Sequence, residues 1–478
     1  MIRTRIAPSP TGNLHIGTAR TALFNYLFAK KMGGKFIVRI EDTDLERSSR
    51  KFEKDILAGL AWLSIEADES PVAGGKFGPY RQSERTETYR KNLEILLSGG
   101  LAFYCFHSQK ELLEERESLM KSKKPPVHLC EYRNMGPQES EIFKEAKRDY
   151  IIRFKNHVGR QIFFHDLIRG DLTFESDLIG DFSIAKRIDI PLYNFAVVVD
   201  DETMQISHCI RGEDHLSNTP KQILLIEALG FKKPKYAHLP LILGLDRSKL
   251  SKRHGATSVG EYKEMGYLPE AMFNFMSLLG WNPGDDREIL PKEELIKLFS
   301  LEKVQKSGAI FDINKLDWMN GEYIRRKSLA ELSELSRPFL KNFLRGSKSK
   351  EHIEKILAVE QPRLKKLSDL PEKTDYFFKE PKYERGLLRW KKMTDDEISS
   401  SLNLAIGLLK ENKSLEIEKL EKVFLEEAQK MGDRGLLFWP LRVALSGKEA
   451  SAGPFEIIKI LGIEKTAARL KYALKLFS

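Results

Sequence analysis

The first forty residues alternate between apolar runs and breaks in an order that predicts a strand, a helix and a second strand. Thr4 to Ala7 is a short apolar-leaning run that fits a buried strand. Prolines and a glycine interrupt the chain, and an amphipathic helix follows with the apolar stripe Ile16, Ala19, Leu23, Tyr26 and Leu27. Gly33-Gly34 ends this helix, and Lys35 to Ile40 predicts the second strand. This order predicts a parallel sheet with a right-handed crossover.

The break before the helix has the residues of a phosphate-binding turn. It reads Pro8-Ser9-Pro10-Thr11-Gly12-Asn13-Leu14-His15-Ile16-Gly17-Thr18. Free backbone amides and the helix dipole favour anions at such a place. His15 and Thr18 can donate hydrogen bonds to a polyphosphate, and Gly17 lets a base or ribose approach the backbone. A histidine and a glycine at a helix start are a weak signal alone, and an ordinary helix start is the alternative.

Later segments extend the pattern. Pro191 to Asp201, Ile206 to Ile210 and Tyr236 to Leu243 are predicted as further strands, whereas the stretch 101–190 is mixed and irregular and predicts an insertion between two halves of a sheet. Beyond residue 329, Leu- and Lys-rich segments with few β-branched runs predict an all-α region. The predicted fold class is therefore an α/β domain with a mixed α/β insertion, followed by helices.

Composition narrows the class of protein. A chain of 478 residues predicts two to four domains, and 41% hydrophobic with 31% charged residues fits a globular protein. We expect no membrane span and no signal peptide, because no apolar run approaches ~18 residues and the chain opens on a strand. Three cysteines without obvious pairing favour the cytoplasm. The formal charge of +10 is a mild hint of a polyanionic partner such as nucleic acid.

A second segment strengthens the prediction that the turn before the first helix binds phosphate. Gly244 to Gly255 is a cationic loop containing Ser248-Lys249-Leu250-Ser251-Lys252-Arg253. A lysine-rich loop is usually solvated surface, but His15-Ile16-Gly17-Thr18 and Lys249-Leu250-Ser251-Lys252-Arg253 together resemble the two signatures of the class I aminoacyl-tRNA synthetases. Pro8-Ser9-Pro10-Thr11-Gly12 and Arg39-Ile40-Glu41-Asp42-Thr43-Asp44 are similar to the bacterial glutamyl-tRNA synthetase family in particular. The resemblance runs nearly end to end.

The resemblance implies a domain order. A Rossmann-type catalytic domain is expected in two halves, 1–100 and 191–255, separated by an acceptor-stem-binding insertion at 101–190. A stem-contact domain is expected at 256–328 and an α-helical anticodon-binding region at 329–478. A monomer in the cytoplasm is expected, with no membrane partner.

The resemblance also implies a reaction, in which ATP with Mg²⁺ activates L-glutamate to glutamyl-adenylate and the glutamyl group passes to the 3' end of tRNA-Glu. The expected catalytic residues are His15, Lys249 and Lys252. The expected ATP-binding residues are Pro8, Ser9, Pro10, Thr11, Gly12, His15, Ile16, Gly17, Thr18, Lys249, Leu250, Ser251, Lys252 and Arg253. The expected glutamate-binding residues are Arg5, Ser9, Glu41, Tyr193 and Arg211.

Residue chemistry supports part of this assignment. Arg5 and Arg211 are predicted to reach the carboxyl edge of one sheet, where two like charges are costly without an anion. A ligand carboxylate would supply that anion, and an arginine can bind it through two parallel hydrogen bonds. A single arginine at a strand end is otherwise an ordinary surface charge, and the acidic residues from Glu41 to Asp44 could equally begin a helix.

The insertion contains two close pairs of cysteine and histidine. Cys105 and His107, with His128 and Cys130, have the residue types of a tetrahedral zinc site. Zinc-binding relatives in the family often use Cys-x-Cys with Cys-x-His, and this sequence departs from that pattern at two positions. The favoured interpretation is that the cysteines are packed and the histidines exposed, with zinc as the alternative.

The helical region carries a hypothesis about which tRNA is charged. The third anticodon base is C for glutamate and G for glutamine. By the resemblance, family members that reject tRNA-Gln place an arginine before a Pro-Arg pair, where this chain has Glu360-Gln361-Pro362-Arg363. Gln361 can donate and accept, so tRNA-Gln is a second expected substrate; the alternatives are a surface glutamine without base contact, or compensation by Arg363 or Arg442.

Three rival functions stay open at this point. A small nucleotidyltransferase would not need the C-terminal half, and a truncated paralogue that glutamylates a modified base of tRNA-Asp lacks an anticodon domain. A catalytically inactive tRNA-binding module is the third rival. The presence of His15, Lys249 and Lys252 argues against it.

Overall fold

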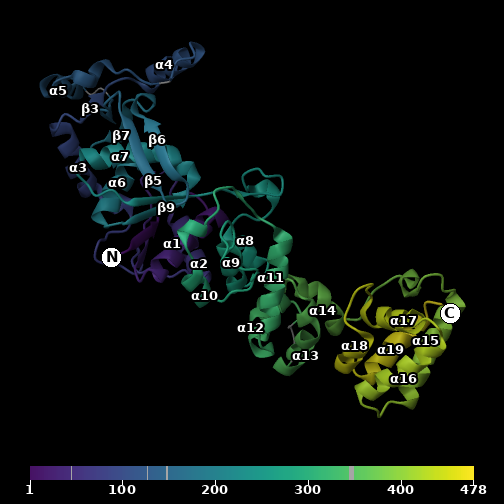
Figure 1. Ribbon diagram of the computed structural model, residues 1–478. Coiled ribbons are helices and arrows are strands. Elements are labelled where there is room, and N and C mark those ends of the chain that lie inside the picture. The colour runs from purple at the N-terminus through teal and green to yellow at the C-terminus, as the bar shows by residue number, and fades with distance from the viewer. Residues whose placement is uncertain (45, 126, 147–148, 344–348, 478) are drawn as a thin grey trace. The chain divides into compact units, whose positions relative to one another are not determined.

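The structure is a computed structural model that describes residues 1–44, 46–125, 127–146, 149–343 and 349–477 (Figure 1). It forms two compact units, one of residues 1–263 and 269–316 and the other of residues 264–268 and 317–478.

The first unit opens with the predicted strand, helix and strand. They are β1 (Arg3–Ile6), α1 (Ile16–Lys31) and β2 (Lys35–Val38). The two strands pair in parallel with Arg3 opposite Lys35 and Ile6 opposite Val38. Helix α1 is buried on most sides, including all five residues of the predicted apolar stripe. The βαβ prediction is confirmed.

A four-stranded sheet continues this architecture. Its order is β6 (Gly170–Glu175), β5 (Gln161–Asp166), β10 (Lys235–Leu239) and β9 (His208–Gly212). The last three strands are parallel, and β6 returns antiparallel to β5. The Ser207 amide donates to the Arg3 carbonyl at 3.0 Å, which places β9 beside β1. The carboxyl ends of these parallel strands therefore share one edge.

One predicted strand is a helix. The segment from Pro191 to Asp201 was predicted as a buried strand because it is a short apolar run rich in valine. The structure has α6 (Tyr193–Thr203) there, with Phe195 to Asp201 buried on every side. A helix that is enclosed all round shows no amphipathic period, so its sequence looks like a buried strand.

Residues of the 101–190 range form a second sheet besides the β5–β6 hairpin. Its antiparallel order is β3 (Ala102–Cys105), β4 (Ile151–Phe154), β7 (Phe182–Arg187) and β8 (Ile190–Pro191). Helices α4 (Gln109–Lys121) and α5 (Pro137–Glu145) lie between β3 and β4 in the chain. The hydrophobic side chains of both sheets, α3 (Thr86–Ser98), α6 and α7 (Thr219–Ala228) share one core.

The rest of the first unit connects the sheet to later helices. The short strands β11 (Ile242–Leu243) and β12 (Ala309–Ile310) pair in parallel. The remaining helices are α2 (Arg50–Trp62), α8 (Val259–Glu264), α9 (Pro269–Ser277) and α10 (Lys292–Leu298), and α11 (Ile313–Arg326) contains the boundary between the units.

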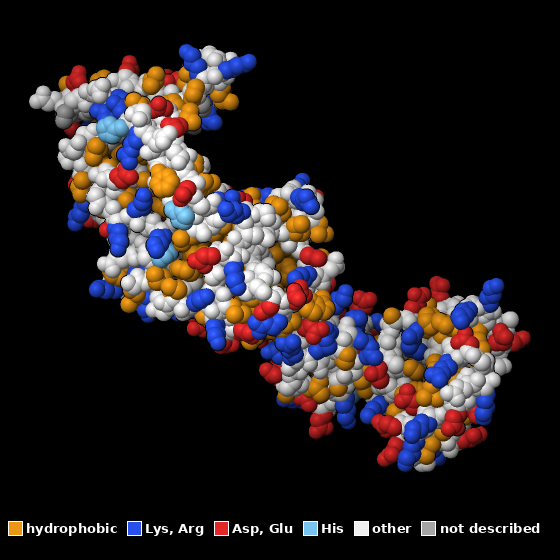
Figure 2. All heavy atoms as spheres, viewed as in Figure 1, with side chains coloured by type: hydrophobic (Ala, Val, Ile, Leu, Met, Phe, Trp, Pro, Cys, Tyr) orange, Lys and Arg blue, Asp and Glu red, His pale blue; other side chains and the backbone are white. Residues whose placement is uncertain are grey.

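The described part of the second unit beyond α11 is helical, as predicted. It contains α12 (Leu329–Leu340), α13 (Lys350–Glu360), α14 (Leu370–Phe378), α15 (Asp395–Glu411), α16 (Ile417–Lys430), α17 (Gly435–Ser446), α18 (Pro454–Leu461) and α19 (Ile463–Leu474). Helices α15 to α19 pack on one another around a leucine-rich core (Figure 1). On the face shown in Figure 2, basic and acidic side chains of this unit are interspersed. That face therefore carries no large patch of a single charge.

Candidate functional site

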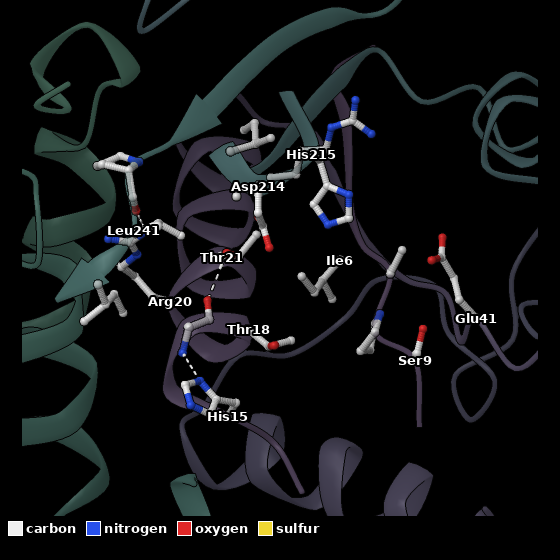
Figure 3. Close-up of a pocket in the computed structure, with 18 of the residues that line it drawn as sticks. Ile6, Ser9, His15, Thr18, Arg20, Thr21, Glu41, Asp214, His215 and Leu241 are labelled. Atoms are coloured by element: carbon white, nitrogen blue, oxygen red, sulfur yellow. Dashed lines mark hydrogen bonds between the residues drawn. The ribbon is translucent and has the colours of Figure 1, made fainter. Parts of the chain in front are cut away.

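A pocket of about 480 Å³ opens at the carboxyl edge of the parallel strands (Figure 3). It lies within the first unit and is lined by the ends of β1 and β9, the start of α1 and the segment after β10. Among the predicted site residues it gathers Arg5, Pro8, Ser9, His15, Gly17, Thr18, Glu41, Tyr193, Arg211, Lys249 and Leu250. The pocket is not lined by Pro10, Thr11, Gly12, Ile16, Ser251, Lys252 or Arg253, which flank these residues in the chain.

His15 caps the N-terminus of α1 with its side chain. Its Nδ1 accepts a hydrogen bond from the Gly17 amide at 3.1 Å (Figure 3). Burial, and the nearby charge of Lys249, lower the pKa of His15 below its ordinary value, so the ring is neutral at pH 7. With Nδ1 acting as an acceptor, the proton must reside on Nε2. The histidine can therefore donate one hydrogen bond to an anion at the helix start.

The two signature segments are joined by backbone hydrogen bonds. The Ile16 amide donates to the Thr257 carbonyl and the Val259 amide donates to the Leu14 carbonyl, both at 2.9 Å. The chain that follows the cationic loop thus pairs with the turn that precedes α1. Lys249 lines the pocket, whereas Lys252 begins a single 3-10 turn (Lys252–His254) and is exposed.

Arg5 is already paired with a carboxylate of the chain. Its Nε lies 3.0 Å from Asp201 Oδ1, and Arg39 Nη1 lies 2.7 Å from the same oxygen. Arg39 also contacts Glu41 at 3.2 Å, and burial raises the pKa of that glutamate. We expected a ligand to supply the anion that compensates Arg5, but Asp201 supplies it. Asp201 and Arg39 were not among the predicted site residues, although both lie within quoted sequence runs.

Arg211 lies on the same pocket in a different electrostatic setting. Its side chain is almost completely buried, and no described Asp or Glu lies within ion-pair distance of it. The guanidinium donates to His238 Nε2 at 3.2 Å and to Thr219 Oγ1 at 2.8 Å. The buried Nη1 atom has no hydrogen-bond partner among the described residues. A buried cation that has a free donor and no described carboxylate partner is suited to binding an anionic group.

Two aromatic residues complete this side of the pocket. The Tyr193 hydroxyl lies 2.9 Å from Nδ1 of His215, and both residues line the pocket. Burial, followed by the charge of Arg211, lowers the pKa of His215 to about 4. The ring is neutral at pH 7, so Nδ1 can accept a hydrogen bond from the tyrosine hydroxyl. His215 was not predicted, because a histidine after a strand carries no distinctive pattern.

Arg20 is a further pocket residue that the sequence pattern did not reveal. Its guanidinium donates to the carbonyls of Pro240 and Leu279, and burial lowers its pKa to about 10. It therefore ties α1 to the segment after β10 that leads into the cationic loop. Arg20 lies between two apolar residues of the predicted stripe, and the helical pattern alone gives no reason to select it as a site residue.

The predicted cysteine and histidine residues of the insertion form a compact cluster. One ligand atom from each of Cys105, His107, His128 and Cys130 lies within 4.8 Å of the others. His107 Nδ1 is 3.5 Å from Cys105 Sγ and 3.6 Å from Cys130 Sγ, and His128 Nε2 is 3.8 Å from Cys105 Sγ. The favoured interpretation is right that the cysteines are buried, but wrong on the histidines, whose side chains are only 20% and 11% exposed.

Three distances within the cluster match those of a tetrahedral metal site. Ligands at 2.0–2.3 Å from a tetrahedral ion stand about 3.3–3.8 Å apart, which the three distances match. His128 turns its other ring nitrogen, Nδ1, to the carboxylate of Glu115. A carboxylate behind a ligating histidine fixes the tautomer that leaves the facing nitrogen free for a metal. These residues fit zinc.

The predicted anticodon residues belong to the second unit. Gln361 opens a 3-10 turn (Gln361–Arg363), and its Nε2 donates to the carbonyls of Ile324 at 2.9 Å and Lys327 at 2.7 Å. These carbonyls close the C-terminus of α11. Arg442 donates to the Glu449 carbonyl at 2.6 Å and stacks on the Trp439 ring, with 4.7 Å between the guanidinium carbon and the ring centre.

Comparison with known proteins supplies the family. Residues 1–318 match the profile of tRNA synthetases class I (E and Q), catalytic domain, and residues 331–474 match that of an anticodon binding domain. A glutamate–tRNA ligase of Carboxydothermus hydrogenoformans is 48% identical over 477 residues, which cover 98% of this chain and 99% of the relative. Glutamate–tRNA ligase 1 of Caldicellulosiruptor saccharolyticus is 46% identical, with 98% of each chain covered.

A solved structure agrees with this result. The crystal structure of a glutamate tRNA ligase from Elizabethkingia meningosepticum, in complex with its amino acid, superposes with a TM-score of 0.89 at 33% identity and covers 100% of each chain. Within the described residues, no helix has the length and apolar character that crossing a bilayer requires. The chain belongs to the class I tRNA synthetases of the glutamate and glutamine (E and Q) family.

Proposed function

We propose that this protein is an ATP-dependent ligase that joins L-glutamate to tRNA-Glu. In the first step the α-carboxylate of glutamate attacks the α-phosphorus of ATP, and diphosphate leaves. In the second step a hydroxyl of the terminal adenosine of the tRNA attacks the activated carbonyl, and AMP leaves. The observation that carries the proposal is the pocket itself, which gathers residues of both signature segments and the buried Arg211, whose Nη1 has no partner among the described residues.

The residues at the start of α1 would receive ATP. Backbone from Pro8 to Thr18, the helix dipole and the Nε2–H of His15 together favour the phosphates. Lys249 lies at the pocket and Lys252 on the exposed turn beyond it, from which a lysine can approach the diphosphate as its charge develops. Mg²⁺ would bridge the phosphates, and we assign it no protein ligand.

Glutamate would lie between the two arginine-bearing strands. Arg211 offers a free donor and an uncompensated charge to the side-chain carboxylate, and Tyr193 lies beside it. Glu41, buried at 8% exposure, offers a carboxylate for the α-ammonium group. Arg5 and Ser9 line the same space, with Arg5 held by Asp201. Catalysis then depends on alignment and phosphate stabilisation rather than on a covalent nucleophile.

Diphosphate exchange into ATP tests the function. We expect exchange that requires both glutamate and tRNA, followed by a glutamyl ester on tRNA-Glu. An inactive tRNA-binding module would give no exchange, and a nucleotidyltransferase would exchange without tRNA. A base-modifying paralogue would form a product on tRNA-Asp. Any of these three results would contradict the proposal.

The Cys105, His107, His128 and Cys130 cluster would hold one zinc ion, contrary to the interpretation that the sequence favoured. The ion would join the end of β3 to the 3-10 turn at Glu131–Asn134 and so brace the insertion. We expect one zinc per chain by elemental analysis, lost in Cys130→Ser and retained in Cys209→Ser, whose sulfur lies outside the cluster. Protein prepared with zinc that contains none would overturn this site.

We also propose that tRNA-Gln is a substrate. The two donor hydrogens of the Gln361 amide face the α11 carbonyls, which leaves its carbonyl oxygen for a base. An acceptor suits the N1–H and N2–H donors of G, whereas an arginine at this position would oppose them. Charging of purified tRNA-Gln with glutamate tests this. Product that Gln361→Arg suppresses supports the assignment, and absence of product refutes it.

The state and location of the protein are further proposals. We propose a monomer in the cytoplasm; the three free cysteines agree with that compartment. Sedimentation of the purified protein with and without tRNA would reveal a dimer if one forms.

A further inference from the structure

Three buried polar side chains form a row across three adjacent parallel strands. Asp166 ends β5, His238 lies in β10, and Arg211 lies in β9. The strand register places His238 directly opposite Arg211 and Tyr236 opposite Asp166. All three side chains are at most 4% exposed. The row starts in the insertion range and ends at the pocket.

The hydrogen bonds along this row have a defined direction. His238 Nδ1 lies 2.6 Å from Asp166 Oδ2, and the same carboxylate also accepts the backbone amide of His238 at 3.1 Å. Because Asp166 can only accept, Nδ1 carries the proton and Nε2 is bare. Burial lowers the pKa of His238, which keeps the ring neutral. Nε2 is then an acceptor for Arg211 Nε at 3.2 Å.

Thr219 contacts both Arg211 and His238. Its hydroxyl lies 2.8 Å from Arg211 Nη2 and 3.0 Å from His238 Nε2. Two of the three guanidinium nitrogens are therefore fixed by neutral groups, and the third, Nη1, has no partner among the described residues. Fixing the plane by Nε and Nη2 leaves Nη1 as the nitrogen available to a ligand.

We propose that His238, oriented by Asp166, is a positioning residue that fixes the Arg211 guanidinium for the side-chain carboxylate of glutamate while leaving its charge uncompensated. The inference rests on the proposed role of Arg211 in binding glutamate. A carboxylate in place of His238 would fix the same plane but would neutralise the cation. A neutral acceptor provides orientation without that competition, and it favours an anionic ligand over its amide analogue.

Steady-state kinetics on the full-length enzyme with tRNA-Glu test this role. His238→Leu removes the acceptor at similar volume, and we expect the KM for glutamate to rise roughly 10- to 100-fold with little change in the KM for ATP. Discrimination against glutamine should fall as well. His238→Gln, whose carbonyl can reach the Nε2 position, should restore a KM near that of the wild type. An unchanged KM in His238→Leu, or an equal rise in both KM values, would overturn the proposal.

A double-mutant cycle distinguishes the proposed role of His238 from the proposed role of Arg211 in binding glutamate. If His238 acts through Arg211, adding His238→Leu to Arg211→Gln should change the KM for glutamate no further. Additive effects would mean that His238 acts elsewhere. If Arg211→Gln alone leaves the KM unchanged, the proposed role of Arg211 fails instead. Should His238→Leu not fold, Thr219→Val removes the second neutral partner and should raise the KM for glutamate on its own; no rise would overturn the proposal.

Discussion

The two sides of the pocket treat a buried arginine in opposite ways. On one side, Arg5 and Arg39 share the carboxylate of Asp201, so charge is balanced within the chain. On the other, Arg211 is held by the neutral partners His238 and Thr219 and keeps a free Nη1. The difference agrees with our proposal that Arg211 binds a ligand carboxylate, whereas the charges of Arg5 and Arg39 are balanced by a carboxylate of the chain itself.

The largest effect should follow from removing the shared carboxylate. Asp201→Ala leaves Arg5 and Arg39 buried without their common partner, and we expect the free energy of unfolding to fall by about 3–5 kcal/mol. Urea denaturation measures the change. Asp214→Ala is the control, since Asp214 lines the same pocket and forms no ion pair among the described residues. Equal losses of unfolding free energy in Asp201→Ala and Asp214→Ala would contradict the special role of Asp201 in stabilising the fold.

Removing Arg211 should weaken glutamate binding more than it lowers the free energy of unfolding. Arg211→Ala should cost about 2–5 kcal/mol of binding free energy for glutamate, seen as a higher KM and weaker rejection of glutamine. Its free energy of unfolding should fall less than that of Asp201→Ala, because no carboxylate loses a partner. Full activity of the variant would place the ligand carboxylate elsewhere.

One further cation, Lys252, lies outside both environments. Lys252 is exposed and forms no ion pair within the described residues. If it stabilises the departing diphosphate, Lys252→Ala should lower kcat about 10²–10³-fold while the KM values for ATP and glutamate change much less. Single-turnover measurement of adenylate formation tests it, and Lys263, an exposed lysine of α8, offers a matched alanine control. Unchanged kcat would remove Lys252 from the chemistry.

The smallest expected effect is a change in the pKa of His215, which depends on the charge of Arg211. Arg211 helps burial to hold the pKa of His215 at about 4, against an ordinary 6.5. Arg211→Gln should raise this pKa, which NMR titration of the histidine can follow. Because the folded pKa lies below the unfolded one, the stability that neutral His215 contributes is lost as pH falls from about 6.5 towards 4. That loss should be smaller in the variant; an unmoved pKa would mean that the charge is screened.

Sequence patterns predicted the parts of this molecule that depend on local order. The βαβ start, the turn before the helix that His15 caps and the C-terminal helices follow from periodicity, prolines and glycines. The helix from Tyr193 did not, because enclosure on all sides removes its amphipathic signal. Pairings between distant residues were also missed: nothing in the chain near Arg5 indicates that Asp201 compensates it.

The cluster of Cys105, His107, His128 and Cys130 also shows that contacts between distant residues could not be predicted from the sequence. Its residue types were recognised, but the choice between packed cysteines and a metal site depended on how closely His107 and His128 approach them. Spacing along the chain does not determine that approach when a helix and a loop intervene. Gln361 was likewise chosen for its chemistry, and its hydrogen bonds to α11 could not be inferred from sequence.

The β5–β6 hairpin limits how this protein can be recombined with its relatives. It lies inside the 101–190 range, yet β5 is a central strand of the catalytic sheet, next to β10. A chimera that exchanges the whole range would replace Asp166 and the strand that carries it, so β10 would have to pair with a strand from the relative. Crossover points at 106 and 150, between β3 and β4, exchange α4, α5 and the chain around them, so the relative has to supply ligands that match His107, His128 and Cys130 beside the retained Cys105. The genetic unit that can be transplanted is therefore smaller than the segment that the chain order suggests.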